Sequence, residues 1–194
     1  VGEALAAAKA AFPAWRDTPV RVRADIMMKL RGLIERDMDE LTRTVATENG
    51  KCWREAAGDV AKALEMTVLA CSAPSLLMGE SLMDTSSGYD TTLYREPLGV
   101  FAGIAPWNFP AMIPVGWMAP LAIVCGNTFV LKPASTTPMT CLKFAQLYKE
   151  AGIPDGVFNI VPCSRGEAEL LLTHPDVRGI TFVGSTDVGK HVYA

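Results

Sequence analysis

Leu98–Ile104 reads LGVFAGI, and three further short apolar stretches follow it along the chain. These later stretches are Thr128–Leu131, Val157–Val161 and Gly179–Val183. Continuous apolar strands that alternate with helices are typical of a parallel sheet covered by helices on both faces. We therefore predict an α/β fold whose second part is a Rossmann-like, doubly wound parallel sheet. The intervening helices are expected over residues 111–125, 138–151, 165–173 and from 187 onward.

The part of the chain before this sheet is expected to be helical. The alanine-rich stretch 1–12 has a high helix propensity. Thr18 followed by Pro19 is typical of the start of a second helix, with Thr18 as the cap. Asn49 and Gly50 are residues that commonly end a helix.

Apolar side chains at three-to-four spacing predict helices over 20–34, 37–48 and 53–77. Residues 84–90 are polar and rich in turn formers, and 91–96 alternate weakly, like a half-buried strand. We therefore expect one partial nucleotide-binding domain over 1–194, with a helical part at 1–79 and a β/α part at 80–194.

Composition excludes several classes of function. The 194 residues include 18 basic and 21 acidic side chains, and a formal charge of −3 argues against a general nucleic-acid binder. No apolar run reaches the length of a membrane span, and the sequence does not begin with a signal peptide, so we expect no membrane partner. Five cysteines without a CxxC pair fit neither a disulfide scaffold nor a zinc site. They favour reduced thiols in a cytoplasmic protein without a bound metal.

The first sheet strand is followed by Ala105–Pro110, which reads APWNFP. Two prolines make this turn stiff, because each fixes φ and removes a donor. An amide held between them, that of Asn108, is suited to donating hydrogen bonds to a developing oxyanion. Asn108 could equally cap the helix that follows, since asparagine is common at that position.

Two further strand ends carry groups that could meet a nucleotide. Lys132 ends the second strand and could hold a phosphate or ribose hydroxyls, or be an ordinary solvated lysine. Gly184 and Ser185 follow the fourth strand where a helix begins, and free N–H groups there attract phosphate. An ordinary capped helix is the alternative, because the GxGxxG and Walker patterns are absent. Together the three strand ends suit a dinucleotide.

Four stretches together resemble the aldehyde dehydrogenase superfamily in order and spacing, and the resemblance covers essentially the whole chain. They are Ala105–Pro110, Gly126–Pro133, Glu150–Val157 and Phe182–Thr186. Within the superfamily, three further stretches look most like the CoA-acylating methylmalonate-semialdehyde dehydrogenases. These are Tyr94–Val100, Ala111–Pro114 and Cys163–Arg165. Glu48–Lys51 also fits the helical N-terminal part.

The resemblance implies a role for each candidate site residue. Asn108 would be the side-chain donor of the oxyanion hole. Ile104, Ala105 and Trp107 would line the cofactor. Lys132 would bind the adenosine ribose with Ser135 and Thr136 beside it, while Gly184 and Ser185 would meet the pyrophosphate.

The activity implied is NAD(P)-dependent oxidation of a small aldehyde. The expected substrate is methylmalonate or malonate semialdehyde, converted to acyl-CoA through a cysteine thioester, with CoA as co-substrate. NAD is the expected cofactor, but NADP stays open because Ser135 stands where many NAD-preferring relatives carry a glutamate. A non-acylating aldehyde or semialdehyde dehydrogenase and a non-catalytic nucleotide-binding module are the alternatives.

The catalytic cysteine implied by the resemblance matches none of the five cysteines. The chain also starts without Met and stops inside expected helices, which natural domains seldom do. We therefore expect a truncated N-terminal, cofactor-binding piece without the catalytic domain, inactive by itself. The full-length enzyme is expected to be a cytoplasmic homo-oligomer, a dimer or a tetramer.

Overall fold

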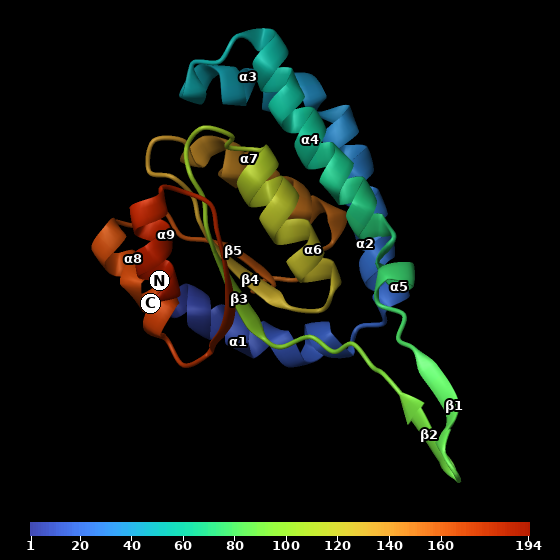
Figure 1. The fold of residues 1–194 in the computed structure, drawn as a ribbon. Helices are drawn as coiled ribbons and strands as arrows, with labels where there is room; N and C mark the ends of the chain where they lie inside the picture. Colours follow the sequence, from blue (N-terminus) through green and yellow to red (C-terminus); the bar gives the residue numbers. More distant parts are fainter.

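A computed structural model describes all residues, 1–194, and contains a four-stranded parallel sheet between layers of helices (Figure 1). The sheet strands are β3 (Val100–Ile104), β4 (Thr128–Lys132), β5 (Phe158–Ile160) and β6 (Val177–Phe182). Their order in space is β5-β4-β3-β6. The chain therefore winds outward from β3 in one direction and then crosses to the other side of β3. The predicted doubly wound sheet is confirmed.

The two faces of the sheet carry separate apolar clusters. Phe129 and Leu131 of β4 belong to the larger cluster, on the side of α6 (Ala119–Val124) and α7 (Pro138–Ala151). Val130, between them, belongs to the smaller cluster with Leu5 of α1 (Gly2–Asp17) and Leu171 of α8 (Arg165–Thr173). Alternation along one strand thus supplies both faces, as expected for a sheet buried on both sides.

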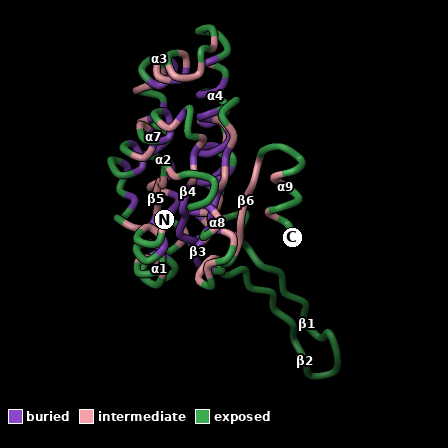
Figure 2. The backbone as a smooth tube through the Cα atoms, turned by 90° about the vertical axis from the view of Figure 1, so that its left-hand side faces the viewer, coloured by how far each residue is buried: buried purple, intermediate pink, exposed green.

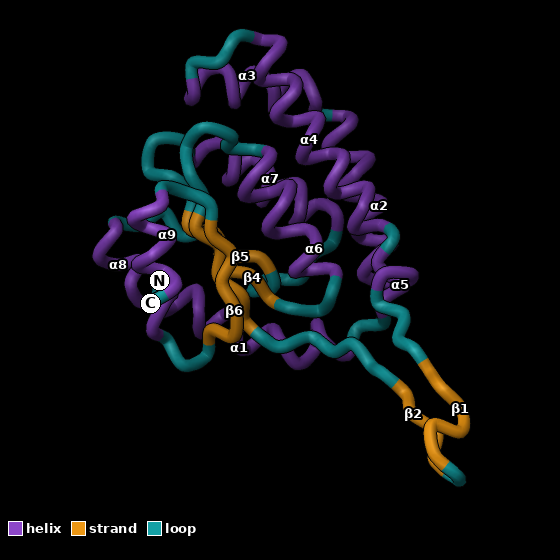
Figure 3. Tube along the Cα trace, in the orientation of Figure 1, coloured by secondary structure: helices purple, strands orange, loops and turns teal.

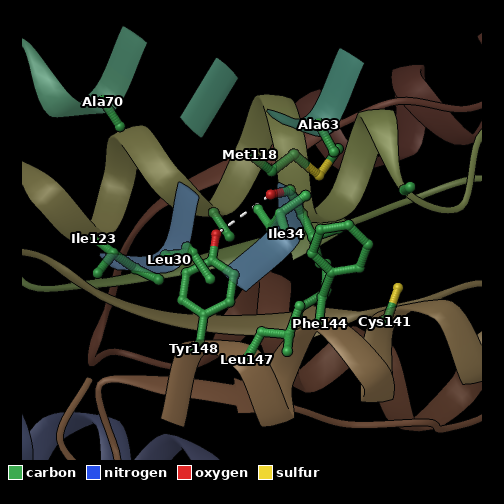
Figure 4. Packing of buried hydrophobic residues seen from close by; sticks show 14 of the residues in the cluster. Leu30, Ile34, Ala63, Ala70, Met118, Ile123, Cys141, Phe144, Leu147 and Tyr148 are labelled. Carbon is green, nitrogen blue, oxygen red and sulfur yellow. Dashed lines mark hydrogen bonds between the residues drawn. The ribbon is translucent and has the colours of Figure 1, made fainter. Parts of the chain in front are cut away.

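A layer of helices lies outside α6 and α7 and extends the larger cluster. These helices are α2 (Val20–Arg36), α3 (Met38–Asn49), α4 (Trp53–Cys71) and the short α5 (Ala73–Leu76). Figure 4 shows Leu30 and Ile34 beside the aromatic rings of α7. The Tyr148 hydroxyl is fully buried there and donates to the Val115 carbonyl at 3.3 Å, which satisfies its only polar group.

The expected helix over 111–125 consists of a π-helical segment, η1 (Met112–Met118), followed by α6. The Ala119 N–H donates to the carbonyl of Pro114, five residues earlier. Pro120 has no N–H to give to a residue four positions back, which accounts for the wider winding before it. The π-helical segment begins directly after the loop that carries Asn108.

Residues 81–92 form an antiparallel hairpin of β1 (Ser81–Ser86) and β2 (Tyr89–Thr92), which projects away from the rest of the molecule (Figures 1 and 3). Figure 2 shows it exposed along its whole length. The expected half-buried strand at 91–96 is therefore wrong, because all six residues are exposed and only 91 and 92 belong to a strand. The turn-rich segment 84–90 contains half of β1 and half of β2. Asp84 has a φ of +51°, and the register between β1 and β2 shifts between Leu82 and Ser86. The sequence of the hairpin therefore shows no regular alternation of apolar and polar residues.

Three helix boundaries differ from the prediction. Helix α1 continues past Pro13 to Asp17, because the Trp15 indole is buried and donates to the Ile123 carbonyl at 2.9 Å. The Thr18 hydroxyl donates to Ala14 at the end of α1, so Pro19 is the N-cap of α2 instead. The expected helix 53–77 is interrupted at Ser72 and divides into α4 and α5.

Gly116 allows η1 to approach α4 closely. A β-carbon on Gly116 would lie 2.9 Å from the Ala63 α-carbon, inside the contact distance of two carbons. We expect Gly116→Ala to lower the free energy of unfolding by about 1–3 kcal/mol, the usual cost of overpacking. Gly58→Ala on α4 is the control, since its β-carbon meets nothing within 4 Å. It should be neutral or stabilising by up to about 1 kcal/mol. Urea unfolding of both variants measures the difference, and equal stabilities would contradict it.

Candidate functional site

The site candidates gather at the carboxyl edge of the parallel sheet. Ile104 at the end of β3 is in register with Lys132 on one side and with Phe182 on the other. The winding direction reverses between β3 and β6, and the crevice at such a switch point is where open α/β sheets bind ligands. The loop after β3 and the turn after β6 both begin at this crevice.

The loop Ala105–Pro110 presents its middle to solvent and anchors its ends. Ala105 and Pro110 are buried, whereas Asn108 and the Trp107 side chain are exposed. The helix that follows has Ala111 at its N-cap and no side-chain cap bond, so Asn108 does not cap it. Asn108 is therefore left available to an external partner, as an oxyanion donor must be.

A cavity of about 190 Å³ lies between α8 and α9 (Thr186–Tyr193), over the ends of two sheet strands. Ile104 and Lys132 both line it. Arg165 and Glu169 line it too, while Ala168, Leu172, Val188 and Val192 make most of the remaining wall apolar. His191 contacts Glu169 at 2.9 Å and ties α8 to α9 at this cavity. An apolar wall with cationic groups beside it suits a nucleoside.

Gly184 and Ser185 line a shallow hollow at the start of α9. Ser185 is the N-cap of α9, but its side chain makes no cap hydrogen bond, and both residues are exposed. The first N–H groups of the helix and the free hydroxyl thus face solvent, which is the arrangement that attracts phosphate.

Ser135 and Thr136 lie in an exposed turn after β4, away from the α8–α9 cavity. Thr136 instead lines a hollow of about 250 Å³ with Trp107, Thr137 and the end of α3. The structure thus brings Ile104 together with Lys132, and Trp107 together with Thr136, in two separate places along one edge. Ser135 is not among the residues that line either.

The sequence did not predict that the end of α3 contacts this edge of the sheet. Both carboxylate oxygens of Glu48 accept N–H groups at the start of α7, from Met139 and Thr140 at 2.8 Å. The Asn49 amide donates to the Trp107 carbonyl at 2.7 Å. A glutamate and an asparagine before Gly50 were the available signal, but they pointed to the end of a helix and not to these distant partners.

The cysteines of this chain do not resemble activated nucleophiles. Burial raises the pKa of the Cys163 thiol, and nearby Lys132 only partly offsets that effect. Burial likewise raises the pKa values of Cys71, Cys125 and Cys141. Cys52 is exposed at the N-cap of α4, and Cys125 is half-buried. A thiol needs a lowered pKa to attack at neutral pH, so none of the four with a raised pKa is suited to it.

The structure contains neither a metal-ligating cluster nor a helix suited to cross a membrane. No group of three or more histidine, cysteine, aspartate or glutamate side chains is placed to hold a metal ion. Long helices occur, but none is apolar over the stretch that a bilayer crossing requires.

The sequence profile of the aldehyde dehydrogenase family matches residues 1–194. The chain belongs to the aldehyde dehydrogenase family. It is 51% identical over 191 residues to malonate-semialdehyde dehydrogenase 2 of Geobacillus kaustophilus (strain HTA426), with 98% of this chain and 39% of the relative aligned. It is 47% identical over 191 residues to an acylating methylmalonate-semialdehyde dehydrogenase of Arabidopsis thaliana, of which it covers 31%, with 98% of its own length.

Among solved structures, an aldehyde dehydrogenase family neighbour from Sinorhizobium meliloti 1021 was determined in complex with NAD. It superposes with a TM-score of 0.96 at 40% identity, over 99% of this chain and 39% of that one. The chain therefore spans 31–39% of the length of these relatives. The helical first part and the parallel sheet are confirmed by this likeness.

Proposed function

We propose that this chain supplies the dinucleotide site and the oxyanion donor of an NAD-dependent aldehyde dehydrogenase. The observation that carries the proposal is that Lys132 ends a strand, and Asn108 and Ser185 follow strands, at the carboxyl edge of one doubly wound sheet. A chain of this family with these groups at its switch point has what cofactor binding requires. The proposed domain division, 1–79 and 80–194, assigns the edge to the second part.

The proposed cofactor site follows the cavities along this edge. Ile104 and Lys132 would hold the adenosine half between α8 and α9, where the wall is largely apolar and Lys132 would face the ribose hydroxyls. Ser185 and Gly184 would meet the pyrophosphate, and Ala105 and Trp107 would lie toward the nicotinamide. When bound, NAD supplies the acceptor for the hydride that leaves the aldehyde.

Ser135 and Thr136 are the remaining residues of the proposed cofactor site. Both side chains are exposed in the turn that follows β4 and Lys132, although neither lines the α8–α9 cavity. With serine at position 135, no carboxylate there repels a 2′-phosphate, so NADP remains a second candidate cofactor. The NAD complex of the Sinorhizobium neighbour favours NAD.

The proposed role of Asn108 is to donate its amide N–H to the oxyanion that forms when the aldehyde is attacked. Its exposure and its freedom from capping support this role. The attacking cysteine, the thioester and the acyl transfer would belong to the remainder of the full-length enzyme. We therefore propose that residues 1–194 alone bind cofactor without turnover. By themselves they would be a non-catalytic nucleotide-binding module.

The proposed substrate is malonate or methylmalonate semialdehyde, and the proposed acyl acceptor is CoA. The names of the Geobacillus and Arabidopsis relatives support the substrates, and the word acylating in the second supports CoA. Mass spectrometry of the products of the full-length enzyme tests the acceptor. An acyl-CoA thioester supports the proposal, whereas free acid in the presence of CoA indicates the non-acylating alternative.

We also propose that the full-length enzyme is a cytoplasmic homo-oligomer, either a dimer or a tetramer. The hairpin β1–β2 exposes Leu82, Met83 and Tyr89 well away from the main body, and apolar side chains gathered in this way favour association. All five cysteines are free thiols, which suits a reducing compartment. Light scattering of the full-length enzyme measures its mass, and a monomer would contradict the assembly.

Lys132→Ala should weaken NAD binding about tenfold, because a ribose hydroxyl then loses a charged donor worth about 1.4 kcal/mol. Calorimetric titration of NAD into the full-length enzyme measures the change. Lys149→Ala is the matched control, since that lysine is exposed on α7 and pairs with Asp155 at 3.0 Å. An unchanged affinity for Lys132→Ala would show that the adenosine ribose lies elsewhere.

A further inference from the structure

We propose that Lys51 and Asp59 are positioning residues that hold the loop of Asn108 in place from the helical part of the chain. This inference rests on the proposed function, since it concerns how the Asn108 amide is placed. Neither residue lies on the sheet, and neither lines the α8–α9 cavity. Their effect on the site passes through the loop and not through contact with a substrate.

Asp59 connects α4 to the residue where η1 begins. Its carboxylate is fully buried, and one oxygen accepts the Met112 N–H at 2.7 Å. The other oxygen lies 2.8 Å from the Lys51 ammonium. The backbone donor and the cation together hold the buried carboxylate in one orientation. The carboxylate therefore fixes the start of η1 relative to α4.

Lys51 uses the same ammonium for a second contact. Its nitrogen lies 4.0 Å from the centroid of the Phe109 ring, within the range of a cation–π interaction. Only 14% of the side chain is exposed, so the attraction is little weakened by water. The ion pair with Asp59 orients the ammonium, and the ammonium orients the ring that directly follows Asn108.

The loop is thus held on both sides of Asn108. The Asn49 amide holds the Trp107 carbonyl before it, and the Lys51–Asp59 pair holds Phe109 and Met112 after it. Asn108 itself is exposed between these anchors. Rigid placement is what an oxyanion donor needs, because a misplacement of about 1 Å can cost about a hundredfold in rate.

Buried ion pairs contribute little net stability, since the cost of desolvation roughly offsets the attraction. Lys51 and Asp59 instead lie beside the loop Ala105–Pro110, so they can fix the position of the exposed Asn108 amide. A purely structural pair would change stability when altered and leave the chemical step alone. A positioning pair would change kcat through Asn108.

The test uses the full-length enzyme with Lys51→Met, Asp59→Asn and the conservative Lys51→Arg. We expect the first two to lower kcat about ten- to a hundredfold, with the KM for aldehyde and the Kd for NAD within about twofold of wild type. Lys51→Arg should restore most of the loss, because it keeps the cation. Lys62→Met is the matched control on α4, where an exposed lysine pairs with Glu65, and it should leave kcat unchanged. A wild-type kcat for Lys51→Met overturns the inference.

A double-mutant cycle with Asn108→Ala decides whether the pair acts through Asn108. Adding Lys51→Met to Asn108→Ala should lower kcat no further, and an additive loss overturns the inference. If Asn108→Ala alone leaves kcat unchanged, the proposed function fails instead. Hydrogen exchange then judges the inference by itself: amides 105–112 should exchange at least about tenfold faster in Lys51→Met, and unchanged exchange overturns it.

Discussion

Asn108→Ala in the full-length enzyme is expected to lower kcat by about 10²–10³-fold, the usual loss when one oxyanion donor is removed. The amide would donate to charge that develops only in the transition state, so the KM for aldehyde and the affinity for NAD should change little. Because Asn108 is exposed and caps no helix, the substitution should not alter the fold. Steady-state rates with saturating NAD measure the effect.

Gln146→Ala is a suitable control for this substitution. Gln146 also carries an exposed amide, but on α7. Its loss should leave kcat as in wild type. If Asn108→Ala changed kcat no more than Gln146→Ala does, the loop after β3 would not contribute to the chemical step.

Arg23→Met is expected to lower the free energy of unfolding by about 3–5 kcal/mol, because it removes a buried cation from its hydrogen-bond acceptors. The guanidinium is buried and donates to the Val124 carbonyl at 2.8 Å, to the Arg16 carbonyl at 3.3 Å and also to Thr18. These carbonyls lie at the ends of α1 and α6, where the helix dipole favours a cation. Methionine fills most of the space but leaves the buried carbonyls without their donor.

Chemical denaturation of Arg23→Met and of Arg21→Met measures this loss of stability. Arg21 lies on the same helix, but its side chain is 81% exposed and pairs with Asp25 at 3.4 Å. Its replacement should cost at most about 1 kcal/mol, as is usual for a surface pair. Similar losses for the two variants would contradict the view that Arg23 joins α1 to α6.

The sheet could be predicted because its two central strands, β3 and β4, are short, largely apolar runs that are mostly buried. Val130 and its neighbours Phe129 and Leu131 belong to opposite clusters, so all three of these consecutive positions are apolar. The hairpin could not be predicted for the opposite reason. Its residues are exposed on both sides, and no pattern of burial marks them.

The site could be predicted where it depends on the ends of neighbouring parallel strands. Ile104 and Lys132 end two parallel strands, and the carboxyl ends of parallel strands lie at the same edge of a sheet. The hold on the loop could not be predicted in this way, because Asn49 and Trp107 are 58 residues apart and belong to different layers. The buried Asn127 is a similar case, since its side chain accepts the Leu98 N–H at 2.8 Å and fixes the start of β3.

The most direct test of the account is the formation of NADH by the full-length enzyme when malonate or methylmalonate semialdehyde is added with NAD and CoA. We expect absorbance at the reduced nicotinamide band to rise only when aldehyde and NAD are both present, and residues 1–194 alone to produce no rise. Failure of the full-length enzyme to reduce NAD with these or any other aldehydes would contradict the account.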